Sequence, residues 1–469
     1  MLERTTVTKI FAYPVIVFAT MAIILSSRAA ASTPDLATRL PETTISGLNN
    51  VLDIAMTGAE SLQMREFIEQ DYEGRRLVAA APKKLQLRGN LNFRKEYDFE
   101  RDESELGERL AYSLALSKTL YHWGALEANR KKGELNLEME ELNTFETYRK
   151  LALDVRRRYL QIVVANRDLE FKQKTLDRRR ATLELEQKGL DSGTASVVQV
   201  YNLELQANAA ELDLLRAENG FQDQVDTLAR LVGSDPRAII DYLPVEVPEP
   251  ATLDEQQIDS LSTLFEQGVS KNISIEQRRK SIDYYQEDLH VARQRNKPNF
   301  GVSFGVTQFE LDEVGRNRAQ EILFGGITVS WNIFDSGSTK GSIVSALARI
   351  EQMKQLFETA KSNYLFELGQ AQKLLDLNRR ILDRDEEALK QARKRIGEMQ
   401  TEIDEGRAAE SSLENVIVSL ASQEVRTNRS RSEYHNALAN MTSLLGLDPF
   451  AQKFIEKRTQ SRSMPISPE

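Results

Sequence analysis

Four segments of the chain alternate strictly between apolar and polar side chains, which is the two-residue period of a β-strand. In the first segment, apolar residues and one glycine share one face, and lysine, arginine, asparagine and glutamine occupy the other. The face is formed by Leu85, Leu87, Gly89, Leu91 and Phe93. The pattern predicts strands over about 84–94, 109–118, 299–308 and 322–333, paired as two hairpins. Their connections, Glu96–Glu108 and Glu310–Glu321, are predicted to be long, charged loops.

Alternation over ~9–11 residues is typical of a membrane β-strand that faces lipid on one side and water on the other. The alternative is a pair of soluble hairpins with one face packed on a core. Charges on the polar faces and the long tips favour the membrane interpretation. Because an open sheet edge leaves backbone groups unpaired in lipid, four strands require several copies of the chain to pool their hairpins.

A seven-residue repeat of apolar positions follows the first hairpin, at Tyr148, Val155, Ile162, Leu169, Leu176 and Leu183. It predicts long coiled-coil helices over about 125–188 and 338–401, each followed by a helix, over about 196–232 and 410–446. A long helix of ~96 Å approximately matches the combined length of the helix at about 48–80, ~50 Å, and the helix at about 196–232, ~55 Å, when these two are stacked end to end. One apolar heptad position beside a polar one means that each helix buries only a narrow seam, which suits the wall of a tube. The Arg178–Arg180 run is interpreted as a solvated helix face.

The chain is an internal duplication, because one constant shift of 213 residues aligns motifs that are far apart. Leu231–Pro236 reappears as Leu444–Pro449 under this shift. We expect a first repeat at 46–241, a proline-rich linker at 242–258, a second repeat at 259–450 and a polar tail at 451–469. Residues 1–31 combine basic residues, a short apolar run and small residues, which predicts a signal peptide cleaved after Ala31; the alternative is a retained anchor.

The composition limits the ligands and reactions that the chain can support. The 469 residues contain 71 acidic and 62 basic side chains, for a net charge of −9, which argues against a sequence-independent nucleic-acid binder. The absence of cysteine excludes disulfides and cysteine-ligated metals, and His122, His290 and His435 are scattered. Gly301–Gly305 matches the G-x-S-x-G nucleophile pattern, but it lies within a predicted strand, so Ser303 is expected to face the lumen. We expect no catalytic site, cofactor or metal.

The chain resembles the TolC family of outer-membrane efflux ducts. The resemblance rests on the duplicated layout, on Trp331–Gly337 before a long helix, on Gly193 and Gly406 in the helix–helix turns, and on Leu-Gly-x-Asp-Pro at the end of the second repeat. It implies a mainly α fold with a membrane β part, which as a homotrimer forms a 12-stranded β-barrel and a long periplasmic α-helical barrel.

For function, the resemblance implies a passive duct in the Gram-negative outer membrane, within a tripartite efflux pump or a type I secretion system. The implied partners are outer-membrane lipid, a periplasmic adaptor (membrane fusion) protein and an inner-membrane transporter of RND or ABC type. The alternative is a periplasmic coiled-coil tether or scaffold with soluble hairpins.

The turns between long helices carry the candidate site. We expect a gate of charged residues that would form a ring in a trimer, at Asp191, Asp404, Glu405 and Arg407. The alternative is that these are ordinary polar turn residues. We expect adaptor contact where small residues allow a close approach, at Gly189, Leu190, Ser192, Gly193, Thr194, Ser196 and Gly406.

Overall fold

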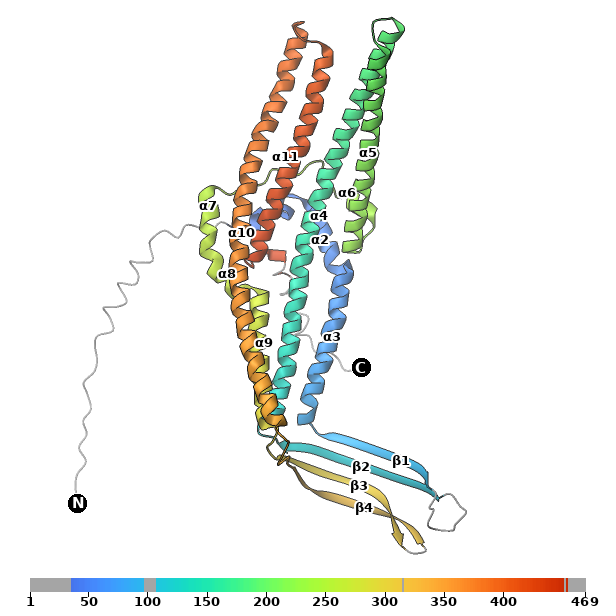
Figure 1. The fold of residues 1–469 in the computed structure, drawn as a ribbon, viewed down its shortest axis with the longest axis vertical. Coiled ribbons are helices and arrows are strands. Elements are labelled where there is room, and N and C mark those ends of the chain that lie inside the picture. The colour runs from blue at the N-terminus through green and yellow to red at the C-terminus, as the bar shows by residue number, and fades with distance from the viewer. Residues whose placement is uncertain (1–34, 97–106, 314–315, 451–452, 454–469) are drawn as a thin grey trace, which may run out of the picture.

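The molecule is long and mainly helical, with a four-stranded sheet at one end (Figure 1). The computed structural model describes residues 35–96, 107–313, 316–450 and 453. The predicted signal peptide lies outside the described residues, as does nearly all of the predicted polar tail. The predicted fold class, mainly α with a small β part in a duplicated layout, is confirmed.

The duplication is visible in the order of the elements. The first repeat consists of α2 (Ser46–Gly58), α3 (Glu60–Ala80), β1 (Gln86–Glu96), β2 (Gly107–Tyr121), α4 (Ala125–Asp191) and α5 (Val197–Val232). The second consists of α8 (Phe265–Lys271), α9 (Ile273–Gln294), β3 (Asn299–Glu313), β4 (Arg316–Ser330), α10 (Ser338–Asp404) and α11 (Glu410–Leu444). The pairs α3 and α9, β1 and β3, and α4 and α10 each begin 213 residues apart. Short elements complete the fold: η1 (Ala37–Arg39), α1 (Pro41–Thr44), η2 (Ala81–Lys83), α6 (Pro236–Asp241), α7 (Glu255–Ser260) and η3 (Leu261–Leu264).

The prediction of a single helix at about 48–80 is wrong, because the helix is interrupted at Ala59, whose ψ of 123° is extended, and forms two helices, α2 and α3. The break lies where α2 meets the end of α5. A Cβ on Gly58 would lie 2.6 Å from the carbonyl oxygen of Val232, so two backbones touch there. Packing between segments distant in sequence therefore sets the break. It also places α3 and α5 end to end beside α4, as the helix lengths predict (Figure 1).

The sheet is antiparallel in the order β1-β2-β3-β4. Its register aligns the alternating segments so that apolar residues from all four strands share one face. One row across the sheet is Leu87, Leu116, Phe304 and Gly325. The Phe304 ring covers Gly325 so closely that a Cβ there would lie 2.9 Å from Cδ2, which explains the glycine.

The second hairpin corrects a prediction. Pairing continues to Glu313 and Arg316, so Glu310–Glu321 is not a long loop. The alternation of apolar and polar residues stops before the strands end. Strand pairing continues because it is made by backbone N–H and C=O groups, which do not depend on the type of side chain. β4 in turn ends at Ser330, before the predicted boundary at 333.

Each long helix begins after a sharp corner formed by two left-handed residues. Trp123 and Gly124 have φ values of 49° and 83°, and Ser336 and Gly337 have 52° and 88°. Left-handed backbone is costly for a residue other than glycine, so the surrounding structure must impose it at Trp123 and Ser336. The repeated corner redirects the chain from the sheet into α4 and α10.

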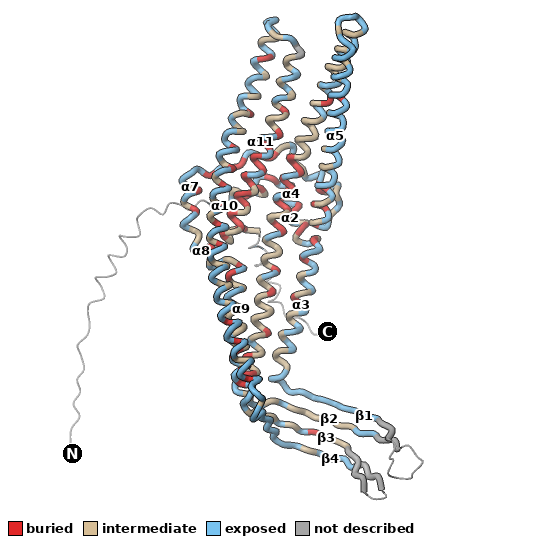
Figure 2. Tube along the Cα trace, in the orientation of Figure 1, coloured by how far each residue is buried: buried red, intermediate tan, exposed pale blue. Residues whose placement is uncertain are grey.

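Buried residues concentrate in the middle of the molecule, which we call the waist (Figure 2). One apolar cluster joins α2, α4 and α5 around Tyr159 and Leu228, and a second joins α10, α11 and α7 around Leu368 and Tyr434. Away from the waist, the helices bury a narrower seam that includes Leu176 and Leu389.

The predicted linker crosses the waist against α11. Its backbone is held by side chains of that helix: Asn428 Oδ1 accepts from the Val247 N–H at 2.6 Å, and Arg431 donates to the Val247 carbonyl at 2.9 Å. The Tyr434 hydroxyl accepts from the Leu253 N–H at 2.8 Å. Because Val247 and Leu253 are buried, this segment is part of the core.

A fully buried arginine ties both ends of the described chain to α4. Arg156 Nε donates to Glu42 at 3.0 Å, and its Nη1 and Nη2 donate to Asp448 at 2.6 and 3.0 Å. Burial alone would lower the pKa of Arg156, but the two carboxylates raise it above its ordinary value. The aspartate of the second Leu-Gly-x-Asp-Pro motif thus has a structural partner.

Candidate functional site

The apolar face of the sheet is exposed in the single chain. Leu87, Leu91 and Ile327 are 67%, 75% and 74% exposed. Such a face in contact with water would be a strong aggregation hazard, so it requires an apolar covering. On the opposite face Ser303 lies in register between Ser117 and Gly326. The G-x-S-x-G pattern is therefore part of a strand interior, without the strand-to-helix turn that a nucleophile needs.

One order of elements runs from the sheet to the tip. β1 and β4 are the edges of the sheet. Next to the sheet, α3 packs on α4, α4 on α9, and α9 on α10. Beyond the waist, α5 packs on α4, α4 on α11, and α11 on α10. One edge of the molecule is therefore β1, α3 and α5, and the other is β4 and α10.

Exposed large apolar side chains gather on these edge helices. On the first edge they are Met64, Phe67, Leu77, Val78, Val197, Val198, Tyr201, Leu205, Leu212 and Leu215. On the second they are Val344, Leu347, Phe366, Leu374, Leu377 and Ile381. The inner helices α4 and α11 expose far fewer, Leu185 and Ile417 among them. The edges are thus the faces that a neighbouring copy would cover.

The two tips are compact turns at the end of the molecule opposite the sheet (Figure 1). Gly193 and Gly406 have φ values of 78° and 71°, which favour glycine. In the first turn, the Gly189 carbonyl accepts from the Thr194 N–H at 2.8 Å and from the Ser192 hydroxyl at 3.0 Å. These hydrogen bonds fix the shape of the turn and leave its outer surface exposed.

The predicted gate residues lie on two separate turns of one protomer (Figure 1). Arg407 forms an ion pair with Glu405, so one gate carboxylate has a local counter-charge. Gln400 Nε2 donates to Asp404 at 3.2 Å, and Asp191 is exposed on the other turn. A ring of these carboxylates needs further copies of the chain and stays a prediction.

Of the predicted adaptor-contact residues, Ser192, Gly193, Thr194 and Ser196 are exposed, as is Gly406 on the second turn; Gly189 and Leu190 are partly buried. The side-chain hydroxyls of Ser192 and Thr194 both bond to the Gly189 carbonyl, which limits their use by a partner. Sequence reasoning missed the exposed apolar residues Val197 and Val198 directly beside this turn. The apolar residues that begin at position 197 of the sequence could have indicated this surface.

The two helical arms above the waist are joined by an ion pair between Arg178 of α4 and Glu414 of α11. The prediction that Arg178–Arg180 is a solvated face is wrong for Arg178, whose side chain is only 16% exposed. The run follows the helix surface, so neighbouring arginines point differently: Arg180 pairs with Glu211 of α5 at 3.1 Å.

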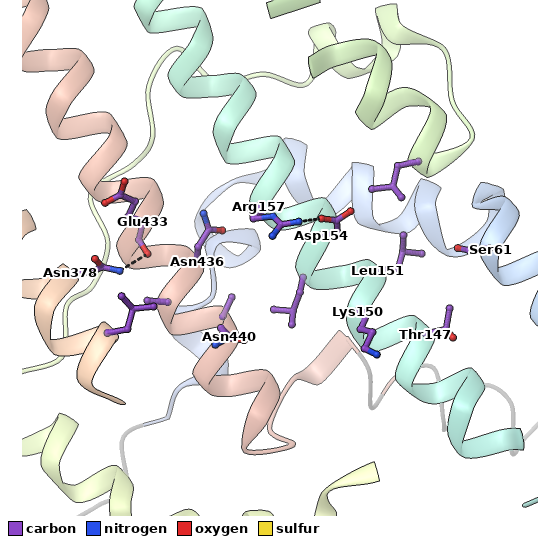
Figure 3. A pocket seen from close by; sticks show the side chains of 15 residues that line it. Ser61, Thr147, Lys150, Leu151, Asp154, Arg157, Asn378, Glu433, Asn436 and Asn440 are labelled. Atoms are coloured by element: carbon purple, nitrogen blue, oxygen red, sulfur yellow. Dashed lines mark hydrogen bonds and ion pairs between the residues drawn. The ribbon is translucent and has the colours of Figure 1, made fainter. Parts of the chain in front are cut away.

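A hollow of about 870 Å³ opens at the waist between α4 and α11 (Figure 3). Leu151 of the first apolar cluster and Ala437 of the second both line it, so the two clusters are not fused there. Charged and amide side chains of the lining pair among themselves, as Arg157 does with Asp154. The hollow separates the two halves of the waist.

Titratable clusters give no metal site: among the described residues, no group of three or more histidine or acidic side chains could hold an ion. His435 is buried and its Nε2 lies 3.4 Å from the Pro248 carbonyl, while His290 Nε2 lies 3.3 Å from the Trp123 carbonyl. None of the helices in the described part of the chain is long and apolar enough to cross a membrane.

Several solved structures share the fold. The outer membrane protein VceC from Vibrio cholerae has 18% sequence identity and a TM-score of 0.64, with 87% of this chain and 98% of that chain covered. The Campylobacter jejuni CmeC outer membrane channel has 12% identity and a TM-score of 0.67, covering 88% and 89%. The open state of the Neisseria gonorrhoeae MtrE outer membrane channel has 14% identity and a TM-score of 0.60, covering 86% and 89%.

No curated protein matches the sequence. The family described as outer membrane efflux protein matches residues 96–234 and 264–447, which is most of both repeats. The TolC-family resemblance is thereby confirmed, and the chain belongs to the outer membrane efflux protein family.

Proposed function

We propose that three copies of this chain form a passive duct through a Gram-negative outer membrane. The duct would continue as a helical tunnel toward a periplasmic adaptor and an inner-membrane transporter of RND or ABC type, in a tripartite efflux pump or a type I secretion system. The driving force would come from the transporter.

The observation that carries this proposal is the consistent order of the two edges. An open sheet edge is incompatible with lipid, so β4 of one copy must pair with β1 of the next. The same rotation places α10 against α3 and α5 of the neighbour, where both sides expose apolar side chains. Such head-to-tail contacts form a ring when the rotation closes, and a sheet without open edges in lipid requires that closure. Three copies give the twelve strands that the family resemblance implies.

Assembly is tested by changing one edge. The double variant Leu205→Glu/Leu212→Glu places charges on the exposed stripe of α5 and should abolish the trimer, measured as mass in detergent by light scattering. Leu205→Met/Leu212→Met keeps the stripe apolar and should assemble normally. A protein that fractionates as a soluble monomer or dimer, with no membrane association, would support a periplasmic tether instead.

The tip carboxylates are proposed to contribute to a closed resting gate, because like charges brought together around the axis bind protons or cations that can bridge neighbouring copies. Single-channel conductance of the reconstituted trimer tests this. Asp404→Ala and Glu405→Ala should raise the open probability and lower cation selectivity. Glu351→Ala, an exposed carboxylate at the other end of α10, is the matched control. Unchanged opening and selectivity in both tip variants would contradict the gate.

The first turn is proposed as an adaptor contact because its outer surface is small and exposed. Ser196→Trp should reduce both export and cross-linking to the adaptor. Ser419→Trp, at an exposed position on the inner helix α11 and away from the edges, should leave export unchanged. Full export by the Ser196 variant would refute this contact.

A further inference from the structure

Both tryptophans of the chain lie where the sheet meets the helices. The Trp123 indole N–H donates to the Pro298 carbonyl at 2.9 Å, and the Trp331 indole N–H donates to the Asn296 carbonyl at 2.8 Å. Two indoles from different repeats therefore hold the same connection between α9 and β3. Their rings stay 37% and 57% exposed, so this anchoring does not bury them.

Cationic side chains surround this connection. Lys297 Nζ lies 4.8 Å from the centroid of the Trp123 ring, and Arg293 and Arg295 are exposed at the end of α9. Lys118 is in register with Val302 and therefore projects from the apolar face of the sheet. Residues 289–309 contain no acidic side chain, nor do residues 109–126. We call Lys118, Trp123, Arg293, Arg295, Lys297 and Trp331 the corner belt.

Two acidic groups that follow the corners are used within the chain. The Asp335 carboxylate accepts from the backbone N–H groups of Gly337 at 3.1 Å and Thr339 at 2.7 Å, at the start of α10. Glu127 forms ion pairs with Lys83 and Arg130. The corner belt is therefore a local positive surface on a chain whose net charge is −9.

The sequence that connects β1 and β2 has the opposite charge. Residues 96–108 include seven acidic side chains and one arginine. The corner belt thus gives the apolar face a basic, tryptophan-bearing end beside the helices. Exposed tryptophans with a polar edge favour the headgroup level of a membrane, and lysine and arginine there attract anionic headgroups.

We propose that the corner belt binds the phosphate groups of anionic phospholipids in the leaflet on the helical side of the membrane. This inference rests on the proposed function, because it requires the apolar face to lie in lipid. The cations supply the charge preference, while the indole rings and the adjoining apolar face select a lipid over a soluble anion. Each cation near an anionic surface favours it by about fivefold, so a several-fold local enrichment is expected.

The two tryptophans are the probe for the test, since no other residue contributes tryptophan fluorescence. The full-length trimer is reconstituted in phosphatidylcholine vesicles in which one fifth of the lipid is either brominated phosphatidylglycerol or brominated phosphatidylcholine. Stronger quenching by the brominated phosphatidylglycerol is expected, and added inorganic phosphate should not reduce it. The variant Lys118→Gln/Arg293→Gln/Lys297→Gln removes three of the four cations and should lower the quenching ratio of the two lipids several-fold toward one, as charge complementarity requires.

The matched control is Lys188→Gln/Arg216→Gln/Lys394→Gln, which removes three exposed cations from the arms and leaves the corner unchanged. It should keep the full preference. Equal quenching by both lipids in the unmodified protein would overturn the lipid preference and leave the duct intact. No quenching by either lipid would mean that the corner is outside the membrane, and the proposed function would fail with it. Loss of quenching on adding phosphate would assign the belt to soluble anions and contradict the proposal.

Discussion

The waist and the arms above it are built from the same helices, α4, α5, α10 and α11, but these helices are buried to different extents in the two regions. At the waist Arg156, Tyr159 and Tyr434 are almost fully buried, with their polar atoms bonded to other segments of the chain. In the arms, polar groups pair mostly at the surface, as Lys188 does with Glu184. Most of the core is therefore in the waist (Figure 2).

This difference shows that the interactions most costly to lose are concentrated in the waist. A buried charge pair is costly to break, whereas an exposed pair contributes about 0–1 kcal/mol. Similar substitutions should therefore differ in cost according to height along the molecule. Urea titration of the detergent-solubilised protein measures each free energy of unfolding and so compares the two regions.

Arg156→Met should have the largest effect. It leaves the buried Asp448 and the partly buried Glu42 without their shared cation, which should lower the free energy of unfolding by about 3–5 kcal/mol. Arg216→Met removes an arginine that is 77% exposed on α5 and should change it by less than about 0.5 kcal/mol. Similar values for the two variants would remove the distinction between waist and arms.

Gly233→Ala should cause the next largest loss in the free energy of unfolding, and Gly406→Ala is the corresponding variant at the tip. Both glycines are left-handed, with φ of 72° and 71°, so alanine costs about 1–2 kcal/mol at either site. At Gly233 the new Cβ would also lie 2.2 Å from the Gly58 carbonyl oxygen, which should add about 1–3 kcal/mol. At Gly406 it meets nothing within 4 Å. Equal losses would show that the waist can relax around a methyl group.

His435 should make the waist sensitive to acid. Burial lowers its pKa to about 4, from an ordinary 6.5, and Arg431 adds to this effect. Between these values the unfolded chain binds a proton that the folded chain does not, so stability falls as the pH decreases from about 7 toward 4. From pH 7.5 to 5 the loss should be about 2 kcal/mol, and His435→Gln should lack this part of the pH dependence. An unchanged pH profile in the variant would assign the acid sensitivity elsewhere.

Arg407→Gln at the second tip should have the smallest effect on stability. Its side chain and that of Glu405 are 65% and 51% exposed, so losing the pair should change the free energy of unfolding by less than about 0.5 kcal/mol. A loss above 1 kcal/mol would show that the tip is as tightly determined as the waist.

The sequence predicts the repeating parts of the fold well. Leu87, Leu116 and Phe304 share a face because a strand has a period of two, and this holds wherever the face is apolar. The ends of elements are less predictable. The break at Ala59 depends on contact between Gly58 and the end of α5, which no local pattern encodes. The second hairpin extends to Glu313 because backbone pairing does not require apolar side chains.

For the candidate site, sequence locates the tip residues but not their partners. Gly193 and Gly406 lie in turns because a left-handed position follows each long helix. The Arg178–Glu414 pair and the linker contacts of Arg431 join residues more than 180 positions apart, so spacing along the chain cannot reveal them.

The two unlike edges of the chain have a genetic consequence. A copy with a damaged β1, α3 and α5 edge still presents a normal β4 and α10 edge, so it can join a growing ring but cannot close it. In a cell that makes normal and edge-damaged copies equally, only about one ring in eight would contain three normal chains, by mass action. Such alleles should be dominant, whereas alleles that unfold the waist should be recessive. Co-expression with the normal gene, scored by export, separates the two classes.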